Sequence, residues 1–152
     1  MDNFDLGRFL PFRLNRLAER LSRAMIPIYR DGFGMTRAEW RVLAHLRTEG
    51  AATASALVVL TAMDKVKISR AIAALEGRGW IARAADPTDR RVNHLHLTTA
   101  GRAVLDALTP QMVAGEQAAL SRLSDDQRRR IAAALDDLEA AFAVVGADQS
   151  PD

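Results

Sequence analysis

The chain has 152 residues, 49% of them hydrophobic and 26% charged, enough for one typical domain with a buried core and too apolar for intrinsic disorder. Its net charge of +2 suggests no partner, and the lack of cysteine excludes a disulfide framework, a thiolate metal site, a cysteine nucleophile and a cysteine redox sensor. No apolar run approaches the ~20 residues that span a bilayer, and the acidic start lacks the basic segment of a secretory signal, so we expect a soluble, cytoplasmic protein.

The first predicted helix covers residues 10–28, where leucines recur at helical spacing. Four arginines fall between them: Arg13, Arg16, Arg20 and Arg23. Pro27 is expected to kink or loosen the last turn, and Gly32 and Gly34 to break the chain.

A second helix is predicted next, followed by two short helices that are joined by a tight turn. Residues 36–39 read Thr-Arg-Ala-Glu, a capping box that begins the longer helix, and Gly50 ends it. Thr53 caps the next helix, and Asp64 caps another that runs to about Arg78. This order is typical of a helix-turn-helix.

A β-hairpin is predicted next, because the hydrophobic period changes from 3.6 to 2. Residues 80–83 and 92–97 form the strands, and residues 86–89 have turn chemistry. The hairpin loop carries Arg90 and Arg91. A helix-turn-helix followed by a basic hairpin is a winged helix, which is a more specific pattern than either half.

Two C-terminal helices complete the prediction. Thr98 or Thr99 begins a long helix that includes Leu120 and Leu123, and residues 124–127 form the capping box of the last helix. The last helix has an apolar seam that should pack against another helix: Ile131, Leu135, Leu138, Phe142 and Val145.

Several motifs, taken in order, resemble the MarR (multiple antibiotic resistance regulator) family of bacterial transcription factors. They are W-R-V-L at 40–43, M-D-K-V-K-I-S-R at 63–70, L-E-G-R-G-W-I at 75–81, D-P-T-D-R-R at 86–91 and L-H-L-T-T-A-G at 95–101. The resemblance covers residues 8–145, and its most specific part is the wing sequence from Asp86 to Gly101.

The fold class we expect is mainly α with a small β-hairpin wing (α+β). Residues 1–35 are expected to form an N-terminal dimerisation helix, residues 36–98 a winged helix-turn-helix lobe, residues 99–146 C-terminal dimerisation helices, and residues 147–152 a flexible tail. The resemblance further implies an obligate homodimer on pseudo-palindromic operator DNA, released in many members by a small phenolic or other aromatic acid.

The charge of the segments agrees with this division. Residues 1–63 have a net charge of +3, residues 64–102 of +4 and residues 103–152 of −5. The acidic C-terminal part suits a dimer body held away from DNA, although charge counts alone are equally compatible with an ordinary solvated surface.

The predicted DNA-binding residues of the fourth helix are Lys65, Lys67, Ser69 and Arg70. They lie near the helix start, away from its apolar face, and include both lysines of the chain. Residues there can reach base edges in the major groove, and the helix dipole favours phosphate. We expect Arg70 and Lys67 on the base side and Lys65 and Ser69 nearer phosphate; the alternative is a solvated basic edge.

The hairpin adds Asp89, Arg90 and Arg91 to the predicted DNA-binding residues. A narrow minor groove attracts inserted arginine. The resemblance implies that Arg91 is the wing arginine and that Asp89 orients it through a salt bridge. The alternative is a hairpin pair with no role in DNA binding.

Four residues are candidates for binding an aromatic carboxylate effector: Arg13, Arg16, Tyr29 and Trp40. Arginine can hold a carboxylate through two hydrogen bonds, but salt bridging, solvent exposure or core packing explains these residues equally simply. His94 and His96 could form an H-x-H metal pair. Without a further ligand they fit better as polar residues of a wing strand, so we expect no metal and no cofactor.

The expected function is a sequence-specific, homodimeric DNA-binding regulator, a repressor, whose partners are double-stranded operator DNA and a small aromatic carboxylate. The alternative is a helical protein-interaction module that does not bind DNA. An enzyme is not expected, because no activated nucleophile, paired carboxylates or phosphate-binding glycine loop is found.

Overall fold

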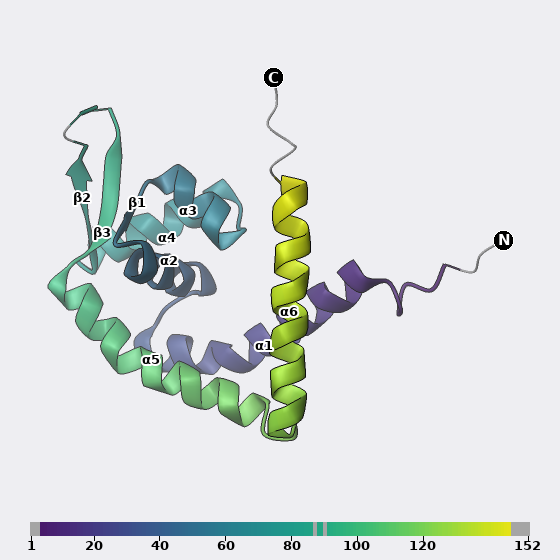
Figure 1. The fold of residues 1–152 in the computed structure, drawn as a ribbon. Coiled ribbons are helices and arrows are strands. Elements are labelled where there is room, and N and C mark those ends of the chain that lie inside the picture. Colours follow the sequence, from purple (N-terminus) through teal and green to yellow (C-terminus); the bar gives the residue numbers. More distant parts are fainter. Residues whose placement is uncertain (1–3, 87, 90, 147–152) are drawn as a thin grey trace. The chain divides into compact units, whose positions relative to one another are not determined.

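The computed structural model describes residues 4–86, 88–89 and 91–146. Its elements are α1 (Leu10–Phe33), α2 (Arg37–Glu49), β1 (Ala51–Ala52), α3 (Ala54–Thr61), α4 (Lys65–Gly77), β2 (Ile81–Ala85), β3 (Asn93–Leu97), α5 (Thr99–Ala119) and α6 (Asp125–Gly146) (Figure 1). They form two compact units, Met1–Gly115 and Glu116–Asp152. Among the described residues, no helix is both long enough and apolar enough to cross a membrane.

Side-chain caps begin the helices after α1, as predicted, whereas α1 begins without one. The Thr36 hydroxyl accepts a hydrogen bond from the Glu39 N–H (3.2 Å), and the Glu39 carboxylate accepts one from the Thr36 N–H (3.4 Å). Asp64 Oδ1 accepts from the Lys67 N–H at the start of α4 (2.9 Å). The same kind of bond begins α3, α5 and α6, where the caps are Thr53, Thr98 and Ser124.

Two helix ends differ from the prediction. Helix α1 continues through Pro27 and Gly32, and it ends where Gly34 adopts a left-handed conformation (φ 61°). Helix α5 ends before Leu120 and Leu123, which were expected inside it. The Leu123 N–H donates to the Leu120 carbonyl (3.0 Å), so the chain tightens into a turn directly before the cap of α6.

The hairpin is present, in a three-stranded antiparallel sheet with the order β1-β3-β2. Ile81 pairs with Leu97 and Ala85 with Asn93, so the strands are shifted slightly from the predicted ranges. Strand β1 was not predicted, because two alanines show no period. The winged helix-turn-helix fold is confirmed.

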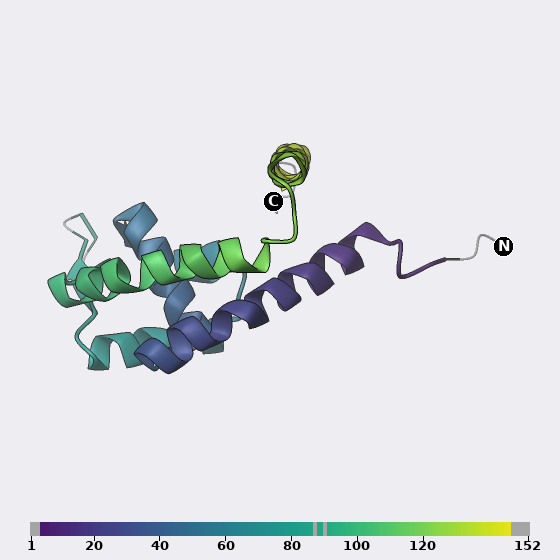
Figure 2. The same ribbon diagram turned by 90° about the horizontal axis from the view of Figure 1, so that it is seen from below.

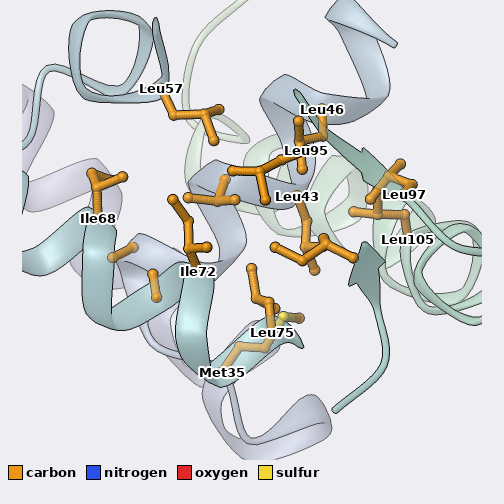
Figure 3. Close-up of a cluster of buried hydrophobic side chains, with 14 of the residues drawn as sticks. Met35, Leu43, Leu46, Leu57, Ile68, Ile72, Leu75, Leu95, Leu97 and Leu105 are labelled. Atoms are coloured by element: carbon orange, nitrogen blue, oxygen red, sulfur yellow. The ribbon is translucent and has the colours of Figure 1, made fainter. Parts of the chain in front are cut away.

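One buried cluster joins the helix-turn-helix to the sheet and to α5 (Figure 3). Its fully buried members come from each of these elements: Leu43, Leu46, Leu57, Ile68, Leu75, Leu95 and Leu105. Since these side chains fix the inner face of α4, the opposite face of that helix is left on the surface.

Helices α1 and α5 approach each other in the first unit (Figure 2). Gly115 of α5 makes the approach close, because a Cβ there would meet the Ile28 side chain. Gly101, at the start of α5, lies against the Trp80 backbone, where a Cβ would overlap the carbonyl oxygen. Figure 1 shows α1 and α5 on one side of the helix-turn-helix and the hairpin tip on the other.

Candidate nucleic-acid interface

Helix α4 has one buried and one exposed face. Ile68, Ile72 and Leu75 point into the core. The opposite face follows the i, i+3, i+4, i+7 spacing of a helix and consists of exposed residues: Val66, Ser69, Arg70 and Ala73. A helix supported from behind in this way can present its outer face to a groove of DNA.

The four predicted residues of α4 are all exposed, and they border two grooves. Lys65 and Ser69 line a groove of about 330 Å³ between α3 and α4. Lys67 and Arg70 line another, of about 560 Å³, between α4 and the start of α2. The helix is therefore a ridge with a lysine and a serine on one flank and two cationic residues on the other.

Lys67 is tied to the N-cap of α4. Its ammonium lies 3.2 Å from Asp64 Oδ2, and hydrogen bonding by the Lys67 N–H and ammonium lowers the pKa of the Asp64 carboxyl. Among the described residues, none forms an ion pair with Lys65 or Arg70. Arg70 is therefore freer than Lys67 to bind a ligand.

A salt bridge attaches the hairpin to α4. The Arg83 guanidinium of β2 binds both carboxylate oxygens of Glu76, with a distance of 3.0 Å between Nη2 and Oε2. Hydrogen bonding to Glu76 raises the pKa of Arg83. This bidentate pair joins the two basic elements, and the Arg83 charge also compensates the negative charge of Glu76.

The Asp86 carboxylate organises the turn of the hairpin. Its Oδ1 accepts hydrogen bonds from the Thr88 N–H (2.7 Å) and the Asp89 N–H (3.1 Å), and its Oδ2 lies 2.9 Å from His94 Nε2. Hydrogen bonds, those from Thr88 foremost, hold the pKa of the Asp86 carboxyl well below its usual range. The loop conformation therefore depends on an ionised Asp86.

Asp86→Ala is expected to raise the hydrogen-exchange rates of the Thr88 and Asp89 amides roughly tenfold, because each amide loses its acceptor. Exchange measured by NMR tests this, with Asp86→Asn, which keeps one acceptor oxygen, as the matched control. The folded-state pKa is lowered, so the stabilising effect is complete above the unfolded value of about 4 and decreases only as pH falls below it. Unchanged exchange in Asp86→Ala would contradict this role.

The predicted wing residues are only partly described. Arg90 lies outside the described residues. Arg91 is exposed, and Asp89 Oδ1 accepts a hydrogen bond from the Arg91 backbone N–H (2.9 Å). Over the described part of the hairpin, the expected side-chain salt bridge between Asp89 and Arg91 is not formed. Asp89 thus shapes the backbone before Arg91 and leaves its guanidinium unpaired there.

A second candidate site is a cavity of about 120 Å³ between α1, α2 and α5. Tyr29 and Trp40, two of the predicted effector residues, both line it. The Tyr29 side chain is buried, and no described residue hydrogen-bonds its hydroxyl. Burial raises the pKa of Tyr29, which keeps the hydroxyl protonated and able to donate.

The arginines of this cavity are not the predicted ones. Arg13 and Arg16 are exposed on α1 and do not line it, whereas Arg37 and Arg41 do. Arg37 is held by Glu19 (2.9 Å) and by Ser22 Oγ (2.9 Å). The cavity thus combines cationic, hydroxyl and apolar groups, the last including Met25, Trp40 and Met112.

Arg41 connects the cavity to the helix-turn-helix. Its Nη1 donates to the Thr61 carbonyl at the end of α3 (2.8 Å), in the turn before α4. Burial lowers the pKa of Arg41, although a guanidinium remains charged at neutral pH. A change in the position of Arg41 would therefore alter its hydrogen bond to the turn between α3 and α4.

The two wing histidines belong to β3. His94 is bound to Asp86, and His96 lies in the middle strand of the sheet. Within the described part of the chain, no three His, Asp or Glu side chains gather into a group that could hold a metal.

Four residues were not assigned to these sites from the sequence: Val66 on the exposed face of α4, Arg83 beside the α3–α4 groove, and Arg37 and Arg41 in the cavity. The helical period could have found Val66, which lies three and four residues before Ser69 and Arg70. The others depend on tertiary contacts, and no local pattern marks them.

Comparison with known proteins supports the family resemblance. A family model described as MarR family matches residues 33–92. A putative transcriptional regulatory protein for the hcr operon of Thauera aromatica is 32% identical over 95 residues, which are 62% of this chain and 57% of that protein. The chain thus spans little more than half the length of that relative.

Solved structures match over most of both chains. A MarR-family transcriptional regulator from Silicibacter pomeroyi is 26% identical with a TM-score of 0.74, covering 93% of this chain and 94% of that one. Bordetella bronchiseptica BpsR is 26% identical with a TM-score of 0.75, and the match covers 90% of this chain and 96% of that one. Its structure is described with a mechanism for regulation of its DNA binding by 6-hydroxynicotinic acid.

Proposed function

The chain belongs to the MarR family of transcriptional regulators, and from this we propose that it is a sequence-specific DNA-binding repressor that acts as a homodimer. In this proposal residues 36–98 bind DNA and residues 1–35 and 99–146 form the dimer, whereas residues 147–152, for which a tail was expected, lie outside the described residues. We assign repression because a dimer seated on promoter DNA excludes other proteins from it.

The observation that carries the proposal is the attachment of a basic hairpin to a basic helix by the Arg83–Glu76 pair. An isolated cationic helix edge is an ordinary surface feature. Here this pair joins β2 to α4, so that exposed cations of the helix and Arg91 of the hairpin can contact one duplex. This combination suits simultaneous binding in adjacent major and minor grooves.

Each residue has a proposed role. Arg70 hydrogen-bonds base edges and Ser69 a base or a phosphate, whereas Lys65 and Lys67 bind phosphates on the two flanks of α4. Lys67 is a weaker candidate for base contact than the sequence suggested, because Asp64 holds its ammonium. Arg91, with Arg90, enters the minor groove, and Asp89 shapes the loop that presents them.

Exposed apolar faces support the homodimer. In the first unit, α1 exposes Leu10, Leu17 and Leu21 by 42%, 55% and 41%. In the second unit, Ile131 and Leu135 of α6 are each 46% exposed. Apolar stripes of this kind are covered when two copies associate, and two-fold symmetry then sets the two α4 helices about 34 Å apart.

A competition mobility-shift assay tests this function. The protein should shift the DNA upstream of its own gene, and excess unlabelled DNA of the same sequence should compete far better than an arbitrary duplex. Equal competition by both would contradict sequence-specific binding and favour a protein-interaction module.

We further propose that the α1–α2–α5 cavity binds a single-ring aromatic carboxylate that releases the DNA. The volume of about 120 Å³ is below the 300–1,000 Å³ typical of ligand sites, so a larger acid is excluded without rearrangement. The carboxylate would bind Arg37 or Arg41, and Tyr29 would donate to a ring substituent or the carboxylate. Competition for Arg41 would weaken its bond to Thr61 and disturb the turn before α4.

Tyr29→Phe should weaken binding of 6-hydroxynicotinic acid roughly fivefold to tenfold, as expected for one hydrogen bond of ~1–1.5 kcal/mol. Without ligand the change should be neutral or stabilising, because the hydroxyl has no partner among the described residues. Thermal shifts measured over a ligand titration test this. Arg13→Ala is the control and should leave the titration unchanged; the absence of any ligand-induced shift in the unmodified protein would contradict the effector proposal.

A further inference from the structure

Val66 is an apolar residue at the start of the exposed face of α4, whose other members are polar, charged or small. Its side chain is 59% exposed, although α4 has a complete apolar face elsewhere. Single exposed apolar residues are common, so exposure alone has no meaning. The position of Val66 is informative, because Ser69 and Arg70 lie three and four residues further along the same face of the helix.

The rest of that face allows close approach to a ligand. Ala73 continues it, and Gly77 follows one turn later, so beyond Arg70 no bulky side chain holds the helix away from a groove. Val66 belongs to the first turn of α4, and in helix-turn-helix proteins residues near the start of the recognition helix contact base edges.

We propose that Val66 is a specificity-determining residue that recognises the 5-methyl group of thymine. This methyl is the one apolar group on the major-groove edges of the four bases, and aliphatic side chains bind it by excluding water. The inference rests on the proposed DNA-binding function and assigns a preferred base to one position of the site. Arg70 beside it would then bind a neighbouring guanine.

Deoxyuridine provides the test, since it differs from thymidine only by lacking this methyl. A duplex selected by the protein from a random pool is synthesised with thymines replaced by deoxyuridine singly and then in symmetric pairs. Affinity is measured by fluorescence anisotropy for the unmodified protein, Val66→Ala and Val66→Thr. Val59→Ala is the matched control, because it shortens a more exposed valine (79%) that lies on α3.

Loss of one buried methyl should weaken binding about fourfold per half-site, and about tenfold or more for a symmetric pair. Val66→Ala should bind both duplexes with similar affinity, Val66→Thr should keep part of the difference, and Val59→Ala should keep all of it. The inference is overturned if the unmodified protein does not distinguish the duplexes, or if Val66→Ala distinguishes them equally well. Failure to select any sequence overturns the proposed function instead.

Discussion

Gly101→Ala is expected to lower the free energy of unfolding by about 3–5 kcal/mol, the largest effect of any single substitution considered. Helix propensity predicts the opposite sign, since alanine within a helix is usually favoured over glycine by ~0.5–1 kcal/mol. At Gly101 the steric overlap outweighs helix propensity and determines the sign of the change. The new Cβ would overlap the Trp80 carbonyl oxygen and lie 2.9 Å from the carbonyl carbon, and backbone cannot move aside as a side chain does.

Chemical denaturation at a fixed protein concentration measures this effect, with two glycines as controls. Gly32→Ala meets nothing within 4 Å in α1 and should be neutral or stabilising. Gly115→Ala would meet the flexible ends of Ile28 and Met25, so its cost should be smaller than that of Gly101→Ala. If Gly101→Ala and Gly32→Ala have the same free energy of unfolding, the close approach of α5 to Trp80 is wrong.

Arg70→Ala and Arg91→Ala are each expected to weaken binding to a selected duplex tenfold to a hundredfold, the ~1–3 kcal/mol of a good base contact. Arg70 lies on the exposed face of α4, and Arg91 lies on the hairpin attached to that helix. For Arg70, the loss should be much smaller on an arbitrary duplex, because a base contact acts only on the correct sequence. Lys65→Ala should instead weaken both complexes similarly and reduce the salt dependence by about one unit of slope per site.

Arg129→Ala in α6 is the control for net charge. It removes one exposed arginine, 73% accessible, from the acidic C-terminal unit and should leave both affinities nearly unchanged. Titrations by fluorescence anisotropy at two salt concentrations separate these cases. The proposed arrangement is wrong if Arg70→Ala and Arg129→Ala behave alike.

Most of the fold could be predicted, because helix starts and strand periods are local. The caps at Thr36 and Asp64 act on backbone groups three residues away, so the sequence contains both partners. Strand β1 could not be predicted, since its two alanines are held only by pairing with β3. The continuation of α1 through Pro27 likewise depends on packing, which outweighs the one lost hydrogen bond.

The candidate sites could be predicted in part for the same reason. The exposed residues of α4 follow from helix periodicity alone. The arginines of the cavity do not, because Arg37 and Arg41 reach Tyr29 from another helix, whereas Arg13 and Arg16 lie on the helix of Tyr29 but point to solvent. A local pairing can also be misjudged, as with Asp89, which binds the backbone of Arg91 and not its guanidinium.

We propose that two copies place two α4 helices in successive major grooves and two hairpins in the flanking minor grooves. Hydroxyl-radical footprinting of the dimer on a selected duplex tests it most directly. We expect protection symmetric about one centre, with two half-sites about 10 base pairs apart and flanking minor-groove protection that Arg91→Ala removes. A single asymmetric footprint, or protection unchanged in Arg91→Ala, would contradict this account.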